Sequence, residues 1–285
     1  MLLALALLLL PVAHARTRVD LVLSHYAEPL HEVALFVEQA RSALLHSTPE
    51  EGGAELQRVF LVTHDHTVER SSENNWTVMQ VPGGNYGRES SAYLYWIEVH
   101  GREIGLDKVW FSHALPDKYM EKTLWPRLKR LRRRTGMLGL AIMGRTSCKG
   151  GVDVALGPFL GAIHFAHTGK FCRPSTRWSV MNNAEFVVST KRLRLLHRHL
   201  AQQLRQQLAA PDNDEIHVTP GWQTPTLFPQ NSNRVSSVLG YAVERTWNLF
   251  FDCTGIGGGG ASWGQPCDEG GPCAENAAQC LDEME

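Results

Sequence analysis

The amino-acid sequence predicts an α/β protein with a single, mostly parallel sheet flanked by helices. Short apolar runs of strand length alternate with longer segments that carry apolar residues at helical spacing, which is typical of parallel sheets covered by helices. The chain has 285 residues, of which 43% are hydrophobic and 20% charged, enough for one large α/β domain or two small ones.

The first half of the chain supplies four of the predicted strands. Residues 19–26, "VDLVLSHY", form a mostly apolar run and are predicted to be a buried strand. A helix is predicted after Pro29, because apolar residues recur there at helical spacing from Leu30 to Leu44. Further strands are predicted at 58–65, 76–82 and 108–114, with helices from Gly87 to about His100 and near 122–134.

The second half of the chain is less regular. Residues 135–175 are Gly-rich with short apolar pieces, and no element is assigned to them. A strand at 184–189 is predicted to lead into a long helix over 191–209, because leucines at 193, 196, 200, 204 and 208 form one apolar stripe. A final helix is predicted over 237–251.

The two ends of the chain are predicted to lie outside this domain, which spans 16–252. Residues 1–15 are an apolar run followed by Ala13-His14-Ala15, the form of a signal-peptidase site, although the positive segment that usually precedes such a run is missing. The alternative is a buried first strand or a mis-assigned start. Residues 253–285 have no Lys or Arg and five glycines within six residues, which predicts a disordered Cys/Gly-rich, acidic tail.

Cysteine usage and a glycosylation sequon favour the secretory pathway, either the Golgi or ER lumen or the cell exterior. The six cysteines, at 148, 172, 253, 267, 273 and 280, are an even number, as an oxidising compartment favours. We expect local pairing among the last three. Asn75-Trp76-Thr77 is an acceptor sequence for N-glycosylation. The net charge of −1 gives no argument for nucleic acid, and membrane association is expected to be peripheral at most.

Polar residues stand where four predicted strands end. These residues are Ser24-His25-Tyr26, His64-Asp65-His66, the turn with Arg88 and Glu89, and Ser112-His113. In parallel α/β sheets, ligands bind beyond the carboxyl ends of the strands. The sequence therefore predicts one ligand site at this edge.

The Gly-rich turn "PGGNYGRE" at 82–89 is predicted to bind an anion such as a diphosphate. Its glycines permit close backbone approach, and the helix that follows presents free N–H groups and a positive dipole end. Arg88 adds a planar fork that grips phosphate through two hydrogen bonds. The alternative is that Glu89 only stabilises the helix dipole and Arg88 is a solvated surface charge.

Two further groups have both a functional and a structural interpretation. His113 and Asp117, or His64 with His66, have side chains suited to metal ligation, but each is equally well a polar loop residue. The segment 126–134, "PRLKRLRRR", carries six Lys or Arg. It is a solvated helix side or a surface for acidic glycans or an anionic luminal membrane.

Several segments together resemble a known family. "VDLVLSHYAEPL", "NYGRESSAYLYWI", "VWFSHALPD", "AEFVVSTKRL" and "YAVERTWNLFF" occur in the order found in domain-of-unknown-function family 3431, known chiefly from fungi and algae. That family looks like a divergent relative of glycosyltransferases with the Rossmann-like A-type fold. The resemblance spans roughly Val19 to Phe251.

The resemblance implies a nucleotide-diphosphate sugar at the carboxyl edge of the sheet. It places His25 and Tyr26 near the nucleotide, and Asn85, Gly87, Arg88 and Glu89 near the diphosphate or sugar. His113 and Asp117 occupy the place where such enzymes keep an Asp-x-Asp motif for a divalent cation, manganese or magnesium. This chain has "FSHALPD" there instead, which weighs against the metal and against transfer itself. Glu185 is the expected catalytic base.

Three functions follow from this interpretation. The first is transfer of a sugar from a nucleotide-diphosphate donor to a glycan or glycoconjugate acceptor. The second is a catalytically inactive carbohydrate-binding or scaffold protein on the same fold, which the missing Asp-x-Asp favours. The third, a secreted hydrolase that uses His, Asp and a metal, is weakest, because the chain has no nucleophile elbow and no His-Glu-x-x-His motif.

Overall fold

The computed structural model describes most of the chain from Arg16 to Asp282. The described residues are 16–47, 53–68, 74–103, 105–116, 118–141, 143–149, 156–173, 175–212, 214–217, 237–253 and 279–282. The predicted signal peptide at 1–15 lies outside them. None of the helices in these ranges is long and apolar enough to cross a membrane.

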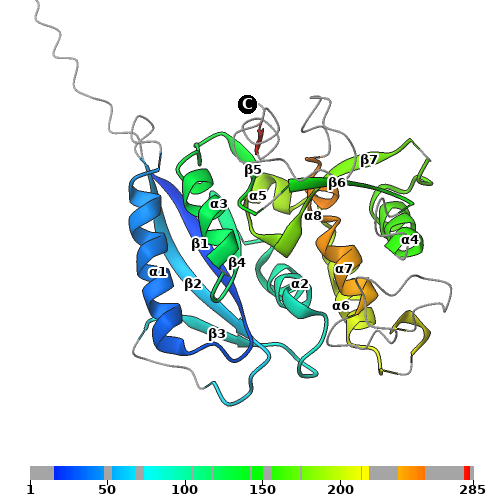
Figure 1. Cartoon of the computed structure of the whole chain (residues 1–285), viewed down its shortest axis with the longest axis horizontal. Coiled ribbons are helices and arrows are strands. Elements are labelled where there is room, and N and C mark those ends of the chain that lie inside the picture. Colours follow the sequence, from blue (N-terminus) through cyan, green and yellow to red (C-terminus); the bar gives the residue numbers. More distant parts are fainter. Residues whose placement is uncertain are drawn as a thin grey trace, which may run out of the picture.

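A seven-stranded sheet forms the centre of the fold, in the order β3-β2-β1-β4-β8-β5-β9 (Figure 1). The strands β3, β2, β1, β4 and β5 run in one direction, and β8 and β9 run in the other. The prediction of a mostly parallel sheet is therefore confirmed. The strands are β1 (Thr17–His25), β2 (Ala54–Thr63), β3 (Thr77–Gln80), β4 (Lys108–His113), β5 (Thr135–Gly139), β8 (Phe186–Ser189) and β9 (Gln279–Leu281).

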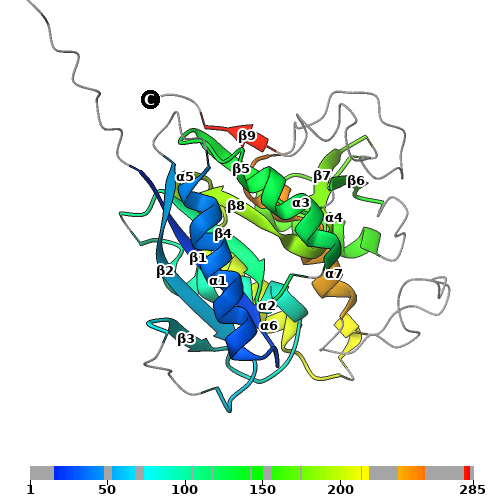
Figure 2. The ribbon, with the colours of Figure 1, turned by 60° about the vertical axis from the view of Figure 1, so that its left-hand side comes forward.

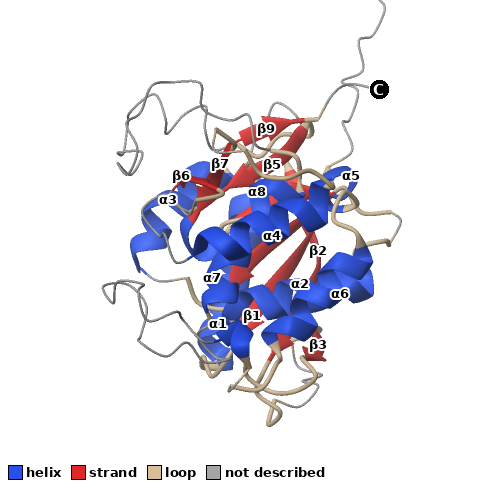
Figure 3. Cartoon of the chain, turned by 90° about the vertical axis from the view of Figure 1, so that its right-hand side faces the viewer, coloured by secondary structure: helices blue, strands red, loops and turns tan. Residues whose placement is uncertain are grey.

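Helices cover both faces of the sheet. The helices are α1 (Leu30–Leu45), α2 (Arg88–His100), α3 (Lys118–Leu128), α4 (Gly157–Thr168), α5 (Thr190–Leu193), α6 (Arg198–Leu208), α7 (Val238–Glu244) and α8 (Trp247–Phe250). Helices α1 and α3 pack on one face, and α2, α6, α7 and α8 contribute to the core on the other (Figures 1 and 3). A separate two-stranded antiparallel sheet is formed by β6 (Met143–Ser147) and β7 (Arg177–Met181), which α4 separates in sequence, and β7 and α4 contribute to this second core.

The position of β1 in the sheet explains why its sequence is a continuous apolar run. Val22 belongs to the core on the α2 side, whereas Leu21 and Leu23 belong to the core on the α1 side. Alternate side chains of a strand point to opposite faces, so a strand covered on both faces is apolar throughout. In α2, the apolar residues Tyr93, Leu94 and Ile97 are all buried.

Two predicted long helices are each broken in the structure. The segment predicted as a helix over 191–209 forms α5 and then α6, because His197 adopts extended backbone angles (φ −61°, ψ 130°) at the start of α6. The segment over 237–251 forms α7 and α8, with Arg245 and Thr246 between them. The Thr246 hydroxyl donates to the carbonyl of Val243, a local side-chain bond that competes with continued helix.

The prediction for the C-terminal tail is wrong at its far end. Residues 279–281 form β9, which pairs with β5 at the edge of the sheet (Figure 2). The Arg192 side chain holds this strand in place by donating to the carboxylate of Asp282 at 2.8 Å and to the carbonyl of Leu281 at 3.1 Å. This part of the tail is therefore a strand of the domain.

Two disulfides confirm the oxidised cysteines that the sequence predicted, Cys148–Cys172 and Cys253–Cys280. The expectation of local pairing among the last three cysteines is wrong for Cys280, because β9 carries it back to the domain beside Cys253. Cys267 and Cys273 lie outside the described residues.

We expect the double replacement of Cys253 and Cys280 by serine to lower the free energy of unfolding by about 3 kcal/mol. The bond joins residues 27 apart in sequence, and without it the unfolded chain regains the freedom of that loop. Urea denaturation of the oxidised protein and of the variant measures the difference. If the two proteins have the same stability, the bond does not hold β9 to the sheet.

Candidate functional site

The topology of the sheet marks one position as the expected ligand site. From β1 the chain continues through β2 to β3 on one side, and then returns to place β4 on the other side of β1. In α/β sheets, ligands bind outside the carboxyl ends of the strands at such a switch point. Here β1 leads directly into Tyr26, and β4 ends at His113.

Helix α2 brings a carboxylate to this switch point. The side chain of Glu89, in the first turn of α2, is buried and places Oε2 3.9 Å from His113 Nε2. The Nε of Arg88 lies 3.6 Å from the same oxygen, and its guanidinium also lies over the ring of Tyr241, 4.9 Å from the ring centre. Arg88 and Glu89 therefore contact each other and the ligand edge of the sheet.

The Gly-rich turn that precedes α2 is fixed by contacts with its neighbours. Gly87 has φ 63° and is pressed against Leu208 of α6, whose Cδ1 would lie 2.9 Å from an added Cβ. Nδ1 of His64 donates to the Gly84 carbonyl at 2.7 Å, and Nε2 lies 2.9 Å from the Ser91 hydroxyl. It also stacks on Tyr26 with ring centres 5.1 Å apart. His64 thus ties the turn to the end of β1.

Glu185 is an acid of this site whose pKa is strongly raised. It is completely buried just before β8, and its Oε1 accepts a hydrogen bond from the backbone N–H of His113 at 2.8 Å. Burial raises the pKa of Glu185 to about 7, an effect that nearby His113 partly offsets and Glu89 reinforces. A carboxyl that changes protonation near neutral pH is suited to general acid–base chemistry.

A second buried glutamate, Glu244 at the end of α7, completes the group. Its Oε1 accepts from the backbone N–H of Asn183 at 2.7 Å and from the Arg245 guanidinium at 2.8 Å. Burial raises the pKa of Glu244, and the negative charge of Glu89 raises it further. Asn183 has φ 69°, a left-handed conformation that L-residues adopt only under constraint, and Glu244 holds this turn two residues before Glu185.

Four buried polar atoms at this site have no hydrogen-bond partner among the described residues. They are the hydroxyls of Tyr26 and Tyr93, Oε2 of Glu185 and Nε2 of His113. Buried polar atoms without partners are rare in native proteins, so each calls for an explanation such as a water, an ion or a ligand. The burial of Tyr93, followed by the charges of Glu185 and Glu89, raises the pKa of its hydroxyl and keeps it neutral.

The structure brings some of the predicted site residues together and places others elsewhere. It brings Tyr26, Arg88, Glu89, His113 and Glu185 to one place. His25 instead points into the protein, where its two ring nitrogens contact the Thr63 hydroxyl and the Glu28 carbonyl. Asn85 is exposed on the Gly-rich turn. Asn75 of the predicted glycosylation sequon, which precedes β3, is also exposed.

The predicted metal site is only partly described. Asp117 lies outside the described residues. Within the described ranges, no group of three or more His, Cys, Asp or Glu side chains is arranged to hold a metal ion.

Glu244 is not among the site residues that the sequence predicts. In the structure the Arg245 guanidinium, at the C-cap of α7, lies 2.8 Å from Oε1 of Glu244. A glutamate within the apolar segment "YAVERTW" was the available signal, since a charged residue among core positions needs a partner.

A large cavity lies elsewhere, at the amino ends of β1 and β4. Its volume is about 640 Å³, and charged residues such as Arg18, Asp107 and Lys191 line it. It is on the opposite edge of the sheet from the group of titratable residues at the switch point.

Comparisons with known proteins give no family for this chain. A scan against protein-family models finds no match, and a search of curated proteins finds no similar sequence. The resemblance to the fungal and algal family therefore stays a prediction.

Proposed function

We propose that this protein is a glycosyltransferase-like enzyme of the secretory pathway that transfers a sugar from a nucleotide-diphosphate donor to a glycan or glycoconjugate. The observation that carries the proposal is the convergence of Arg88, Glu89, His113 and Glu185 at the switch point of a mostly parallel sheet. This is the position where such sheets bind nucleotides. The family resemblance and the sheet order, with β8 antiparallel beside β4, agree with an A-type transferase fold.

The reaction would need one proton acceptor and one group that stabilises a leaving diphosphate. The acceptor hydroxyl attacks the anomeric carbon as the bond from that carbon to the diphosphate oxygen breaks, and the hydroxyl proton passes to the Glu185 carboxylate. Arg88 and the N-terminus of α2 meet the charge that develops on the diphosphate.

A divalent cation would find two of its ligands here. His113 Nε2 and Glu89 Oε2 face each other across 3.9 Å, and a cation between them would give the unpartnered histidine nitrogen a role. These two residues alone make an incomplete site, so the mechanism above assigns no step to a metal.

A catalytically inactive carbohydrate-binding or scaffold protein on the same fold is the second candidate. The observation that favours it is the charge of the site, where Arg88 is already paired with Glu89 and two further carboxyls, Glu185 and Glu244, lie close to Glu89. A doubly charged diphosphate binds such a site less well than a neutral sugar does.

We expect Arg88→Ala to abolish binding of a nucleoside diphosphate, because it removes the cation nearest to the predicted diphosphate position. Calorimetric titration with UDP and GDP, each with and without Mn²⁺, measures the loss. The variant also leaves the buried Glu89 without its neighbouring cation, so we expect the melting temperature to fall by a few degrees.

Arg58→Ala is the matched control. Arg58 likewise pairs with a buried carboxylate, Asp20, at 2.6 Å, on β2 and away from the carboxyl ends of β1 and β4. We expect this variant to lose some stability and to keep nucleotide binding. If the wild-type protein binds neither nucleotide but is stabilised by neutral glycans, the inactive carbohydrate-binding protein is the correct interpretation.

A further inference from the structure

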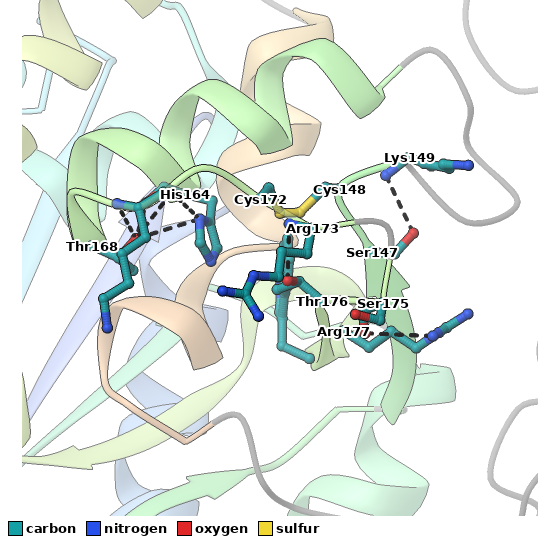
Figure 4. The surroundings of a disulfide bond; sticks show 12 residues. Ser147, Cys148, Lys149, His164, Thr168, Cys172, Arg173, Ser175, Thr176 and Arg177 are labelled. Carbon is teal, nitrogen blue, oxygen red and sulfur yellow. Dashed lines mark hydrogen bonds between the residues drawn. A yellow bond between two sulfur atoms is a disulfide. The ribbon is translucent and has the colours of Figure 1, made fainter.

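A second surface with unusual chemistry surrounds the disulfide Cys148–Cys172, outside the switch-point site. The bond joins the end of the β6 strand to the segment between α4 and β7, with Cα atoms 6.0 Å apart (Figure 4). We define the bridge surface as five exposed residues beside this bond. They are Lys149, Phe165, Lys170, Phe171 and Arg173.

The disulfide and the strand register bring the positive charges together. Lys149 follows Cys148 directly and Arg173 follows Cys172 directly, so the bond brings the two backbones into proximity. Lys170 lies two residues before Cys172. Arg177 extends the same region, because it is paired with Ser147 in the β6–β7 ladder.

Few acids lie near these cations. The sequence from 143 to 179 holds one, Asp153, which lies outside the described residues, and the described residues of this stretch include no Asp or Glu. The side chains of Lys149, Lys170 and Arg173 form no ion pair with any described residue, and the charge of one carboxylate, Asp252, reaches His167 on α4. A surface with this excess of cations attracts polyanions.

An aromatic pair lies within the charged surface. The rings of Phe165 and Phe171 stack with centres 4.8 Å apart and planes inclined by 25°. Phe165 is 45% exposed and Phe171 is 84% exposed, so they present ring faces or edges to the solvent. The face of an aromatic ring is electronegative, and it therefore attracts the positively polarised C–H bonds of a pyranose ring.

The turn that carries Phe171 is held rigidly. Gly169 ends α4 in the left-handed conformation (φ 68°), the Thr168 hydroxyl donates to the His164 carbonyl at 2.8 Å, and the His164 ring contacts the Lys170 carbonyl at 3.0 Å. The disulfide fixes the other end of the turn (Figure 4). A surface fixed in this way loses little conformational entropy when it binds.

We propose that the bridge surface binds a sulfated polysaccharide. The cations pair with sulfate groups, for which the planar Arg173 fork provides two parallel hydrogen bonds, and the phenylalanine pair packs on a sugar ring between them. A sulfated glycan uses both features of the surface. This inference is independent of the proposed transferase function, since it uses no residue of the switch-point site.

The test measures the affinity of the whole protein for a heparin decasaccharide by calorimetry, at an ionic strength of about 0.15 M and at two higher salt concentrations. We expect Lys170→Ala/Arg173→Ala to weaken binding about tenfold or more. Log affinity decreases with log salt, and this decrease should become shallower by about two units of slope, because two fewer counterions are released. We expect Phe171→Ala to weaken binding without changing this slope.

Lys129→Ala/Arg132→Ala is the matched control, since it removes two exposed charges from the other basic segment, at 126–134. This variant should bind heparin as the wild type does, and all variants should keep the wild-type melting temperature. The proposal is overturned if the wild type does not bind heparin or if the control loses as much affinity as the Lys170/Arg173 variant. It is also overturned if vesicles rich in phosphatidylserine bind more tightly than heparin.

Discussion

Gly87→Ala is expected to lower the free energy of unfolding by about 2–5 kcal/mol. Two costs add here. A non-glycine residue at φ 63° costs about 1–2 kcal/mol, and forcing a methyl group against the packed side chain of Leu208 costs about 1–3 kcal/mol more. Because Gly87 also starts α2, the variant should disturb Arg88 and Glu89 and weaken any ligand binding that depends on them.

Gly84→Ala provides the control for the backbone cost alone. Gly84 has φ 85°, but nothing lies within 4 Å of the position where its Cβ would be built. We expect this variant to lose only about 1–2 kcal/mol. Urea denaturation of both variants gives the comparison. Equal losses would show that the close packing of α6 on the turn is not what requires glycine at position 87.

Glu185→Gln is expected to abolish sugar transfer while it stabilises the protein at alkaline pH. The pKa of Glu185 is raised by burial from 4.5 to about 7. Between these values the folded chain holds a proton that the unfolded chain releases, so the free energy of unfolding falls as pH rises through this window. The fall amounts to about 3 kcal/mol, and glutamine, which cannot ionise, should avoid it.

Denaturation of wild type and variant between about pH 4 and pH 8 tests the stability half of this prediction. The two proteins should be similar at the acid end and differ most at the alkaline end. Glu38→Gln, at a carboxyl whose side chain is 69% exposed, is the control and should follow the wild type. A Glu185→Gln variant with the pH profile of the wild type would show that Glu185 does not titrate in this range.

The predicted loss of sugar transfer in Glu185→Gln is measured with a sugar donor and an acceptor that the wild-type protein uses. Loss of a general base typically lowers the rate by about 10²–10⁴-fold. If Glu185→Gln loses sugar transfer and is also more stable than the wild type, the loss cannot come from unfolding. Glu185 then has a catalytic and not only a structural function. If transfer continues at the wild-type rate, Glu185 is not the base.

The sheet could be predicted from sequence because its signals are local. Each central strand is a continuous apolar run, and α2 begins at a glycine that the turn requires. The breaks within the two long predicted helices could not be predicted, since a stripe such as Leu196, Leu200 and Leu204 stays apolar when the helix is interrupted. The extended backbone at His197 and the local side-chain bond of Thr246, and not helical periodicity, mark where these helices break.

In the candidate site, too, some features could be predicted from sequence and others could not. Tyr26, Arg88, Glu89 and His113 could be placed together because strand ends in a parallel sheet share an edge. Glu185 was selected as a carboxylate near that edge, but its pKa depends on complete burial, which no sequence pattern reports. Glu244 reaches the site from a helix more than 50 residues further along the chain, so its part depends entirely on tertiary packing.

The edge strand β9 makes completion of the sheet a late event in biosynthesis. It begins at Gln279, and its partner β5 ends at Gly139, so the two strands lie 140 positions apart in the sequence. The open edge of β5 therefore leaves the ribosome long before the strand that covers it. Cys267 and Cys273 precede Cys280 in the sequence, so if either pairs with Cys253 before β9 is made, the native Cys253–Cys280 bond forms by disulfide exchange.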